Sequence, residues 1–424
     1  MYAIGILFLV AGLLISVGIH ELGHLIPAKR YGVKVSQYFI GFGPTLWSKK
    51  VRGTEYGIKL LPLGGFVRIA GMLPPGKPGR KTVNRRGKLT LAEEVRRDSL
   101  AEIGPGEDSL AFWQLSARKK FVVMFGGPLT NLVLAALCLT VVLCGIGVPR
   151  ATSQVGTVIE CVDESSQCAE KSPAAAAGLR QGDVITAWGG ESVEDWEDLV
   201  GAIGEGGTGD VSVTVLRDGQ EKQLTVRPVE VERTVEASDG TSRVERRPYV
   251  GIRPERVRER QSPVAVADFL GQLTHRTADA LVRLPVGLWE TARSLVTHED
   301  RSNTGVVGIV GVADMAGEIT SSEAESYDWL SRLTNLLLLI GSLNMTLFLF
   351  NLIPLLPLDG GHLAGATFEG VRRWYARLRG RPDPGPADMA RLMPLSYAVA
   401  VGLVFMVIIL VAADVINPVG FIVG

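Results

Sequence analysis

The sequence predicts a polytopic α-helical membrane protein with four transmembrane helices, a membrane-associated β-region and an exported α+β domain. Four long stretches contain no Asp, Glu, Lys or Arg, and each can cross about 30 Å of hydrocarbon. Basic residues gather beside these stretches. A strand-rich segment separates the second stretch from the third. The predicted transmembrane helices are residues 1–30, 118–148, 330–362 and 391–415.

The composition points to a lipid bilayer and away from nucleic acid. Of 424 residues, 46% are hydrophobic, and 44 Lys and Arg balance 44 Asp and Glu. A net charge of zero offers no general attraction to a polyanion. We therefore expect no nucleic-acid partner.

The first helix ends in a metal-hydrolysis motif. An uncharged run from Met1 to Ile19 leads directly into His-Glu-Leu-Gly-His at residues 20–24. On a helix, His20 and His24 lie one turn apart on one face and can bind one Zn²⁺, with Glu21 beside a metal-bound water. The pentapeptide also arises by chance, but ionisable groups are costly in a bilayer, so the context favours a functional site. The run lacks the basic leader and cleavage site of a signal peptide, and we predict that it is retained.

The distribution of Lys and Arg predicts the orientation of the helices. Basic residues follow the first helix and precede the second, and five arginines lie between residues 372 and 381. Because cytoplasmic loops carry an excess of Lys and Arg, residues 31–117 and 363–390 are predicted to be cytoplasmic. Both termini and the strand-rich segment then lie outside, and His24 lies near the cytoplasmic face.

The residues predicted to be cytoplasmic fall into three parts of different character. Residues 31–72 alternate apolar residues with glycine and proline, which predicts short strands joined by tight turns. Such a hairpin can offer an edge to an extended peptide, or it can simply pack on the bilayer surface. Residues 73–117 predict a polar connector, and residues 363–390 predict a basic loop.

The exported segment contains a compact domain at residues 154–228. Its pattern is a strand, a short helix at Ser172–Leu179, a strand near Asp183, a second helix and a strand pair turning at Asp218-Gly219. The order resembles a PDZ domain of the circularly permuted bacterial type. This resemblance implies a peptide-binding groove, with a spacer domain as the alternative. Residues 229–260 predict a charged linker, and residues 261–325 an amphipathic helix or helix pair on the membrane surface.

The four cysteines divide between two environments. Cys138 and Cys144 lie in the second apolar stretch, and we predict that they act as small packing residues. Cys161 and Cys168 bracket a polar loop on the oxidising side and can form a disulfide. Two free thiols remain the alternative.

A catalytic zinc needs a third protein ligand. The end of the third apolar stretch offers Asp359 and His362, at the same membrane depth as His24 in the predicted topology. Prolines break the helix there, and a glycine pair allows close backbone approach beside a cavity. Asp359 is the preferred ligand and His362 the rival, since an imidazole serves zinc equally well. A structural Asp at a helix C-terminus is the remaining alternative, although the helix dipole disfavours it.

These motifs resemble the site-2 protease family of M50-type intramembrane zinc metalloproteases, in particular its bacterial regulator-of-sigma-E group. The resemblance spans nearly the whole chain. One PDZ-like domain stands where several relatives have two, and Val306 stands where proline is usual. Besides HELGH, the matching segments are Gly41-Phe42-Gly43-Pro44, Pro62-Leu63-Gly64-Gly65-Phe66-Val67, Gly127-Pro128-Leu129-Thr130-Asn131, Gly305-Val306-Val307-Gly308-Ile309 and the run from Asn351 to His362.

The resemblance implies roles for particular residues. One Zn²⁺ per chain is expected on His20, His24 and Asp359, with Glu21 as the catalytic acid and base. Asn351 is expected to hold the substrate backbone. The β-region is expected to contact the substrate at Gly41, Gly43, Gly64 and Gly65.

The implied enzyme is a multi-pass protein of the bacterial plasma membrane that cleaves transmembrane segments. Its implied substrates are single-span proteins such as anti-sigma factors, already cut outside by another protease, with the PDZ domain screening out bulky ectodomains. Two other classes remain open at this point. A metal transporter would show inverted repeats, and none is evident. A scaffold with a structural metal would need a fourth protein ligand, for which His362 is the candidate.

Overall fold

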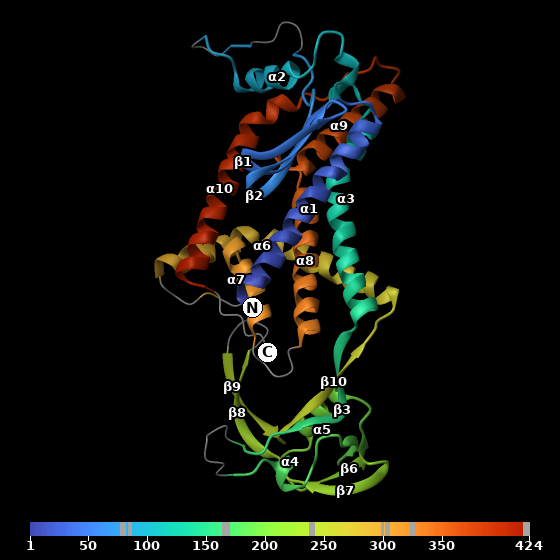
Figure 1. The fold of residues 1–424 in the computed structure, drawn as a ribbon, viewed down its shortest axis with the longest axis vertical. Helices are drawn as coiled ribbons and strands as arrows, with labels where there is room; N and C mark the ends of the chain where they lie inside the picture. Colours follow the sequence, from blue (N-terminus) through green and yellow to red (C-terminus); the bar gives the residue numbers. More distant parts are fainter. Residues whose placement is uncertain are drawn as a thin grey trace. The chain divides into compact units, whose positions relative to one another are not determined.

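The computed structural model describes residues 1–76, 82–83, 87–162, 170–236, 242–297, 301, 306–322 and 328–418. The chain forms two compact units (Figure 1). The membrane unit comprises Met1–Val142 and Pro263–Gly424, and the β unit comprises Leu143–Ser262. Each unit has its own core, so each is described separately below.

Among the residues that the structure describes, four helices of the membrane unit are long and apolar enough to cross a bilayer. The first, second and third of these helices contact one another, as Figure 1 shows. This confirms the predicted four-helix membrane architecture. The helices are α1 (Tyr2–Arg30), α3 (Ala117–Thr140, extended by a π-helical turn at Val141–Ile146), α8 (Trp329–Asn351) and α10 (Met393–Ile416).

Glycines bring α1 and α3 into close contact. A Cβ built on Gly126 would lie 2.0 Å from the carbonyl oxygen of Gly23, so no larger residue fits at this crossing. Small residues at such contacts let helix backbones approach within a membrane. The crossing lies beside His24, and it therefore places α3 against the metal-binding end of α1.

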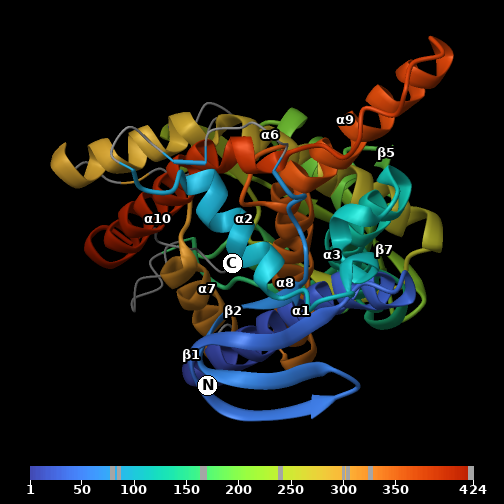
Figure 2. The ribbon, with the colours of Figure 1, turned by 90° about the horizontal axis from the view of Figure 1, so that it is seen from above.

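Strands β1 (Val35–Val51) and β2 (Thr54–Ile69) form one antiparallel sheet beside α1 (Figure 2). The predicted short strands are instead two long strands that each bend midway. Ile40 pairs with both Ile58 and Gly65, so the first half of β1 lies between two parts of β2. The bends occur where Gly41, Gly43 and Gly64 have positive φ, which glycine adopts without steric cost. The segment Gly65–Ile69 is left at one edge of this sheet.

The two segments predicted as a connector and a basic loop contain helices. Residues 73–117 hold α2 (Leu91–Ala101) and short 3₁₀ turns at Asp108–Leu110 and Phe112–Gln114. The predicted loop 363–390 is largely α9 (Asp359–Leu378). Its buried face consists mainly of small residues and includes Glu369, whose carboxylate pairs with Lys120 of α3 at 2.8 Å. A face of this kind lacks the apolar stripe by which a helix is recognised in sequence.

Of the predicted helix or helix pair, the stretch 265–296 forms one helix, and a second helix follows it among the described residues. Helix α6 (Pro263–Thr297) contacts α3, α8 and α10 and lies across them (Figures 1 and 2). It leaves Val282, Val286 and Trp289 exposed. Its placement on a membrane surface remains a prediction.

Helix α7 (Ile309–Ser321) contacts both α1 and α10. Asp414 of α10 accepts hydrogen bonds from the backbone N–H groups of Gly308 and Gly311 and pairs with Arg301 at 3.1 Å. Tyr2 of α1 donates its hydroxyl hydrogen to Asp314 of α7. The start of α1 and the end of α10 therefore lie at the same end of the membrane unit.

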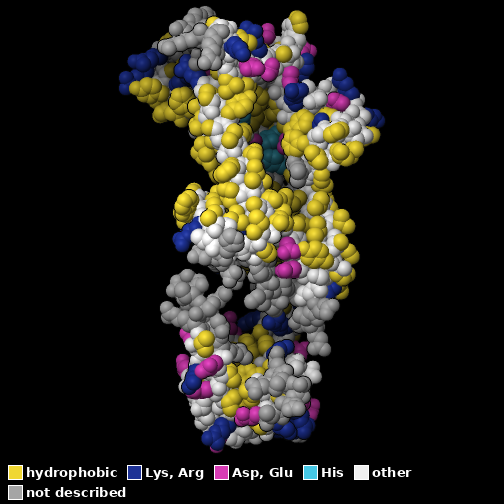
Figure 3. Space-filling model, turned by 90° about the vertical axis from the view of Figure 1, so that its left-hand side faces the viewer, with side chains coloured by type: hydrophobic (Ala, Val, Ile, Leu, Met, Phe, Trp, Pro, Cys, Tyr) yellow, Lys and Arg dark blue, Asp and Glu magenta, His cyan; other side chains and the backbone are white. Residues whose placement is uncertain are grey.

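The surface of the membrane unit is divided by polarity. Figure 3 shows a broad hydrophobic band with Lys and Arg side chains gathered at the end that carries α2. Histidine side chains are visible inside a hollow in this band. The site described below thus opens within the hydrophobic part of the molecule.

The β unit is built on an antiparallel sheet with strand order β10-β3-β4-β6-β7, to which β5 adds beside β4. Trp188, Ile185 and Leu199 lie in its core. The elements are β3 (Val148–Val158), α4 (Pro173–Ala176), β4 (Val184–Trp188), β5 (Glu191–Ser192), α5 (Trp196–Glu205), β6 (Val211–Arg217), β7 (Gln220–Val226), β8 (Val229–Glu236), β9 (Ser242–Tyr249) and β10 (Ile252–Glu259).

The structure replaces the predicted linker at 229–260 with strands. β8 and β9 form a separate hairpin, and β10 pairs with β3 at the edge of the sheet. The domain therefore extends beyond the predicted 154–228 in both directions. Several of the charges that suggested a linker lie on exposed strand faces, as in the pair of Arg246 and Glu232 at 3.1 Å. Charged residues are a common feature of edge strands.

The cysteine predictions fall partly outside the described residues. Cys138 and Cys144 are free thiols. Cys161 is disulfide-bonded, whereas Cys168 lies outside the described residues. Their pairing remains a prediction.

Candidate metal centre

Helix α1 presents both motif histidines to one point. His20 and His24 lie one turn apart, and their Nε2 atoms are 3.3 Å from each other. The two rings meet edge to face, with centroids 4.9 Å apart. His24 is only 4% exposed. The predicted helical placement of the motif is therefore present, with both Nε2 atoms free to face a metal.

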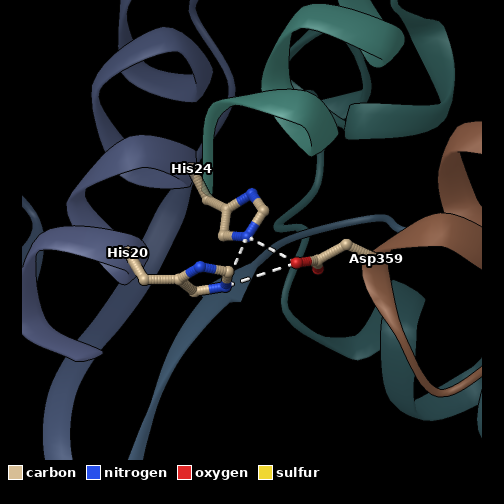
Figure 4. A group of neighbouring side chains, drawn as sticks. All are labelled: His20, His24 and Asp359. Carbon is tan, nitrogen blue, oxygen red and sulfur yellow. Dashed lines mark hydrogen bonds and ion pairs between the residues drawn. The ribbon is translucent and has the colours of Figure 1, made fainter. Parts of the chain in front are cut away.

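The third group comes from the first turn of α9. Asp359 Oδ2 lies 3.3 Å from Nε2 of His20 and 3.3 Å from Nε2 of His24 (Figure 4). The sequence alternative placed this residue at a helix C-terminus, but it begins a helix, where the dipole stabilises a carboxylate. The group therefore spans two segments more than three hundred residues apart in the chain.

The glycine pair makes this turn possible. A Cβ on Gly360 would lie 2.1 Å from the carbonyl oxygen of Ile353, and a Cβ on Gly361 would lie 2.6 Å from the backbone nitrogen of Leu356. The chain folds back on itself here between α8 and α9. Only glycine allows this approach, as predicted, and the fold brings Asp359 to the histidines.

The donor atoms fit a zinc ion in spacing and chemistry. Zn–N and Zn–O bonds of about 2.0–2.1 Å at tetrahedral angles place neighbouring ligand atoms about 3.3 Å apart. All three distances among the donors of His20, His24 and Asp359 are 3.3 Å. Asp359 Oδ2 is buried and receives no hydrogen bond. Three protein ligands leave a fourth position open, which is the arrangement of catalytic rather than structural zinc.

His362 is not part of this group. Only one group of three or more potential metal ligands has all its donor atoms close together among the described residues. It consists of His20, His24 and Asp359. His362 lies almost one turn further along α9. The geometry therefore favours Asp359 over His362 as third ligand.

A cavity of about 280 Å³ adjoins the three donors. It brings together most of the residues that the sequence selected, since Glu21, Asn351, Gly64 and Gly65 all line it. Gly41 and Gly43 do not line it and instead shape the bend of β1. The lining residues are Val17, His20, Glu21, Gly64, Gly65, Asn131, Leu347, Asn351, Pro357, Leu358 and Asp359.

Glu21 faces the edge segment of β2. A Cβ on Gly65 would lie 3.3 Å from Cγ of Glu21, and the carboxylate interacts with the backbone amide of Val67. Glu21 thus lies between the metal ligands and the sheet edge. A carboxylate in this position can exchange protons with a water held at the open metal position.

Helix α3 contributes three features that were not predicted as part of the site. The backbone carbonyl of Val123 lies 2.9 Å from Nδ1 of His24, and Nδ2 of Asn131 lies 3.1 Å from Nδ1 of His20. A Cβ on Gly127 would lie 2.1 Å from Nε2 of His24. Two sequence signals pointed to this helix: Asn131 is an uncharged polar residue within an apolar span, and the segment from Gly127 to Asn131 matches the family.

Comparison of the sequence with known proteins shows the family to which the chain is similar. The model of "Peptidase family M50" matches residues 8–381. Zinc metalloprotease Rip1 of Mycobacterium bovis is 31% identical, with 99% of each chain covered. Metalloprotease MmpA of Caulobacter vibrioides is 29% identical over 87% of this chain and 88% of its own. Regulator of sigma-W protease RasP of Bacillus subtilis is 27% identical over 83% and 87%.

The family match covers both halves of the site, because residues 8–381 contain His20, Glu21, His24 and Asp359. The Rip1 match extends over the β unit as well. A group of three donors that can hold a metal ion agrees with the name zinc metalloprotease that Rip1 carries. The chain therefore belongs to peptidase family M50 and is an intramembrane zinc metalloprotease of the site-2 type.

Proposed function

We propose that this protease holds its zinc on His20, His24 and Asp359 and uses Glu21 to cleave transmembrane segments of single-span membrane proteins. The observation that carries the proposal is the set of three equal 3.3 Å distances beside a cavity that Glu21 lines. The most specific substrates we propose are anti-sigma factors that have already been cut outside the cytoplasm. One relative is named a regulator of sigma-W protease, which supports a substrate of this class.

The chemistry divides between the bound metal and Glu21. When bound by His20, His24 and Asp359, zinc would lower the pKa of a water molecule and polarise the peptide carbonyl. Glu21 takes the proton from the attacking water and later delivers it to the leaving amine, and this exchange requires the carboxylate form at the start. Asn351 also lines the cavity, which supports its proposed role of holding a substrate backbone group.

An extended substrate segment fits the edge of the β1–β2 sheet. A transmembrane helix uses its amides internally, so it must unwind before hydrolysis. Gly65–Ile69 forms an edge of the sheet, and this edge adjoins Glu21. Addition of the substrate as a strand would satisfy its exposed backbone groups while presenting one peptide bond to the site. This favours the substrate-binding interpretation of the hairpin over simple surface packing.

The proposed orientation places the active site near the cytoplasmic face of the bacterial plasma membrane. The basic segments around α2 and α9 then lie in the cytoplasm. Both termini and the PDZ-like β unit lie outside, which is consistent with α1 beginning and α10 ending at α7. The β unit would admit substrates only after their ectodomains have been shortened.

Glu21→Gln is expected to lower cleavage by about 10²- to 10⁴-fold, because a carboxamide cannot accept the proton of the attacking water. The measurement is cleavage of a model single-span substrate in membranes that contain the full-length protein. The variant should keep its zinc, because Glu21 is not one of the three donors.

Glu94→Gln is the matched control, since Glu94 lies exposed on α2. It should cleave like the wild type. Undiminished cleavage by Glu21→Gln would show that Glu21 is not the acid and base.

A further inference from the structure

We propose that Asn131 is a positioning residue that fixes the tautomer and ring orientation of His20. The inference rests on the proposed zinc site and extends it to α3. Asn131 lines the same cavity and is 1% exposed. It does not contact the reacting atoms directly but acts through the imidazole.

A histidine that binds a metal through Nε2 carries its proton on Nδ1. This N–H needs an acceptor, which fixes the ring and makes Nε2 a better ligand. For His24 the acceptor is the backbone carbonyl of Val123, 2.9 Å from Nδ1. Helix α3 therefore stabilises the tautomer of His24 that carries its proton on Nδ1 and leaves Nε2 unprotonated.

The corresponding partner of His20 is a side chain. Asn131 is the polar side chain in contact with Nδ1 of His20, at 3.1 Å through its amide nitrogen. Its carbonyl oxygen is buried and has no hydrogen-bond partner. Exchanging the two ends of the carboxamide, which have nearly the same shape, brings the oxygen to Nδ1–H and gives both groups a partner.

Packing alone gives no reason for an amide at this position. Asn131 lies in a span whose neighbouring residues are mostly apolar, and a polar group without a partner is costly in hydrocarbon. Leucine, which branches at the same carbon, would offer an apolar side chain here. The amide is explained by the hydrogen bond to His20, and the bond is useful only when Nε2 faces a metal.

The test compares zinc affinity in Asn131→Leu and Asn131→Asp. The full-length protein is titrated with zinc against a competing chelator in detergent, and the visible spectrum of its Co²⁺ form reports the geometry of the ligands. Asn131→Leu should weaken zinc binding by about 10- to 100-fold, the usual effect of losing such a partner. Asn131→Asp keeps the acceptor and should bind zinc at least as tightly as the wild type, with an unchanged Co²⁺ spectrum.

Thr140→Val is the matched control, since Thr140 is an exposed polar residue of the same helix whose hydroxyl bonds to the carbonyl of Ala136. It should leave zinc affinity unchanged. Wild-type affinity in Asn131→Leu would overturn the inference, and so would equal weakening in Asn131→Leu and Asn131→Asp. If the leucine variant does not accumulate in membranes, the aspartate variant carries the test alone, because weaker zinc binding there contradicts the inference.

These outcomes separate the inference from the proposed function. If Asn131→Leu binds zinc normally while Glu21→Gln is inactive, the proposed site stands and only the role of Asn131 is wrong. If His20→Ala binds zinc as well as the wild type, the proposed site itself is wrong.

Discussion

Replacing Gly127 with alanine is expected to abolish zinc binding and cleavage. The added methyl carbon would lie 2.1 Å from Nε2 of His24 and 2.6 Å from its Cε1, closer than any non-bonded contact allows. The ring cannot move aside cheaply, because it is buried and its Nδ1 is held by the Val123 carbonyl. Alanine favours a helix over glycine, so α3 should still form. Zinc content and substrate cleavage of the purified full-length protein measure the effect.

Gly145→Ala is the matched control for this substitution. Gly145 belongs to the same span, and a Cβ there meets no atom within 4 Å. This variant should keep its zinc and its activity. Normal zinc content in Gly127→Ala would mean that the metal does not bind at Nε2 of His24.

Asp359→Ala should lower the zinc affinity, whereas His362→Ala should leave it almost unchanged. Removing Asp359 leaves two donors, so zinc affinity should fall by more than the roughly 10- to 100-fold that loss of an outer partner costs. Removing His362 takes away none of the three converging atoms and should leave zinc affinity close to wild type. Chelator competition on the two full-length variants gives the comparison.

The comparison is decisive because both residues lie in the same turn region of α9. General damage to α9 would affect both variants alike and would appear as a lowered unfolding temperature. If His362→Ala loses zinc while Asp359→Ala retains it, the third ligand is the imidazole.

The sequence was sufficient to predict the chemistry because that chemistry follows local rules. The spacing of His20 and His24 fixes their common helix face, and the uncharged run before them identifies the membrane. Asp359 was recognised as a candidate by the adjoining glycine pair and prolines, whose close backbone approach is present in the structure. The sequence pattern and the family resemblance both favour Asp359 over His362. The fold adds the short distances between Asp359 Oδ2 and the two imidazoles.

The features that were not predicted depend on contacts between distant segments. Asn131 lies 111 residues from His20 in the chain, and no local pattern links a polar residue in one span to a ring in another. Helix α9 has a buried face of small residues with Glu369 paired to Lys120, so its sequence resembled a charged loop. Strand β10 carries charges because it lies at a sheet edge, and only its pairing with β3 shows that it belongs to the domain.

The zinc K-edge X-ray absorption spectrum of the full-length protein tests the split metal site most directly. It should show zinc with nitrogen and oxygen ligands at about 2.0–2.1 Å, two of them imidazoles, and no sulfur near 2.3 Å. These ligands correspond to His20, His24, Asp359 and one exchangeable position. A spectrum with three or more imidazoles, or with sulfur bound to the zinc, would contradict the site.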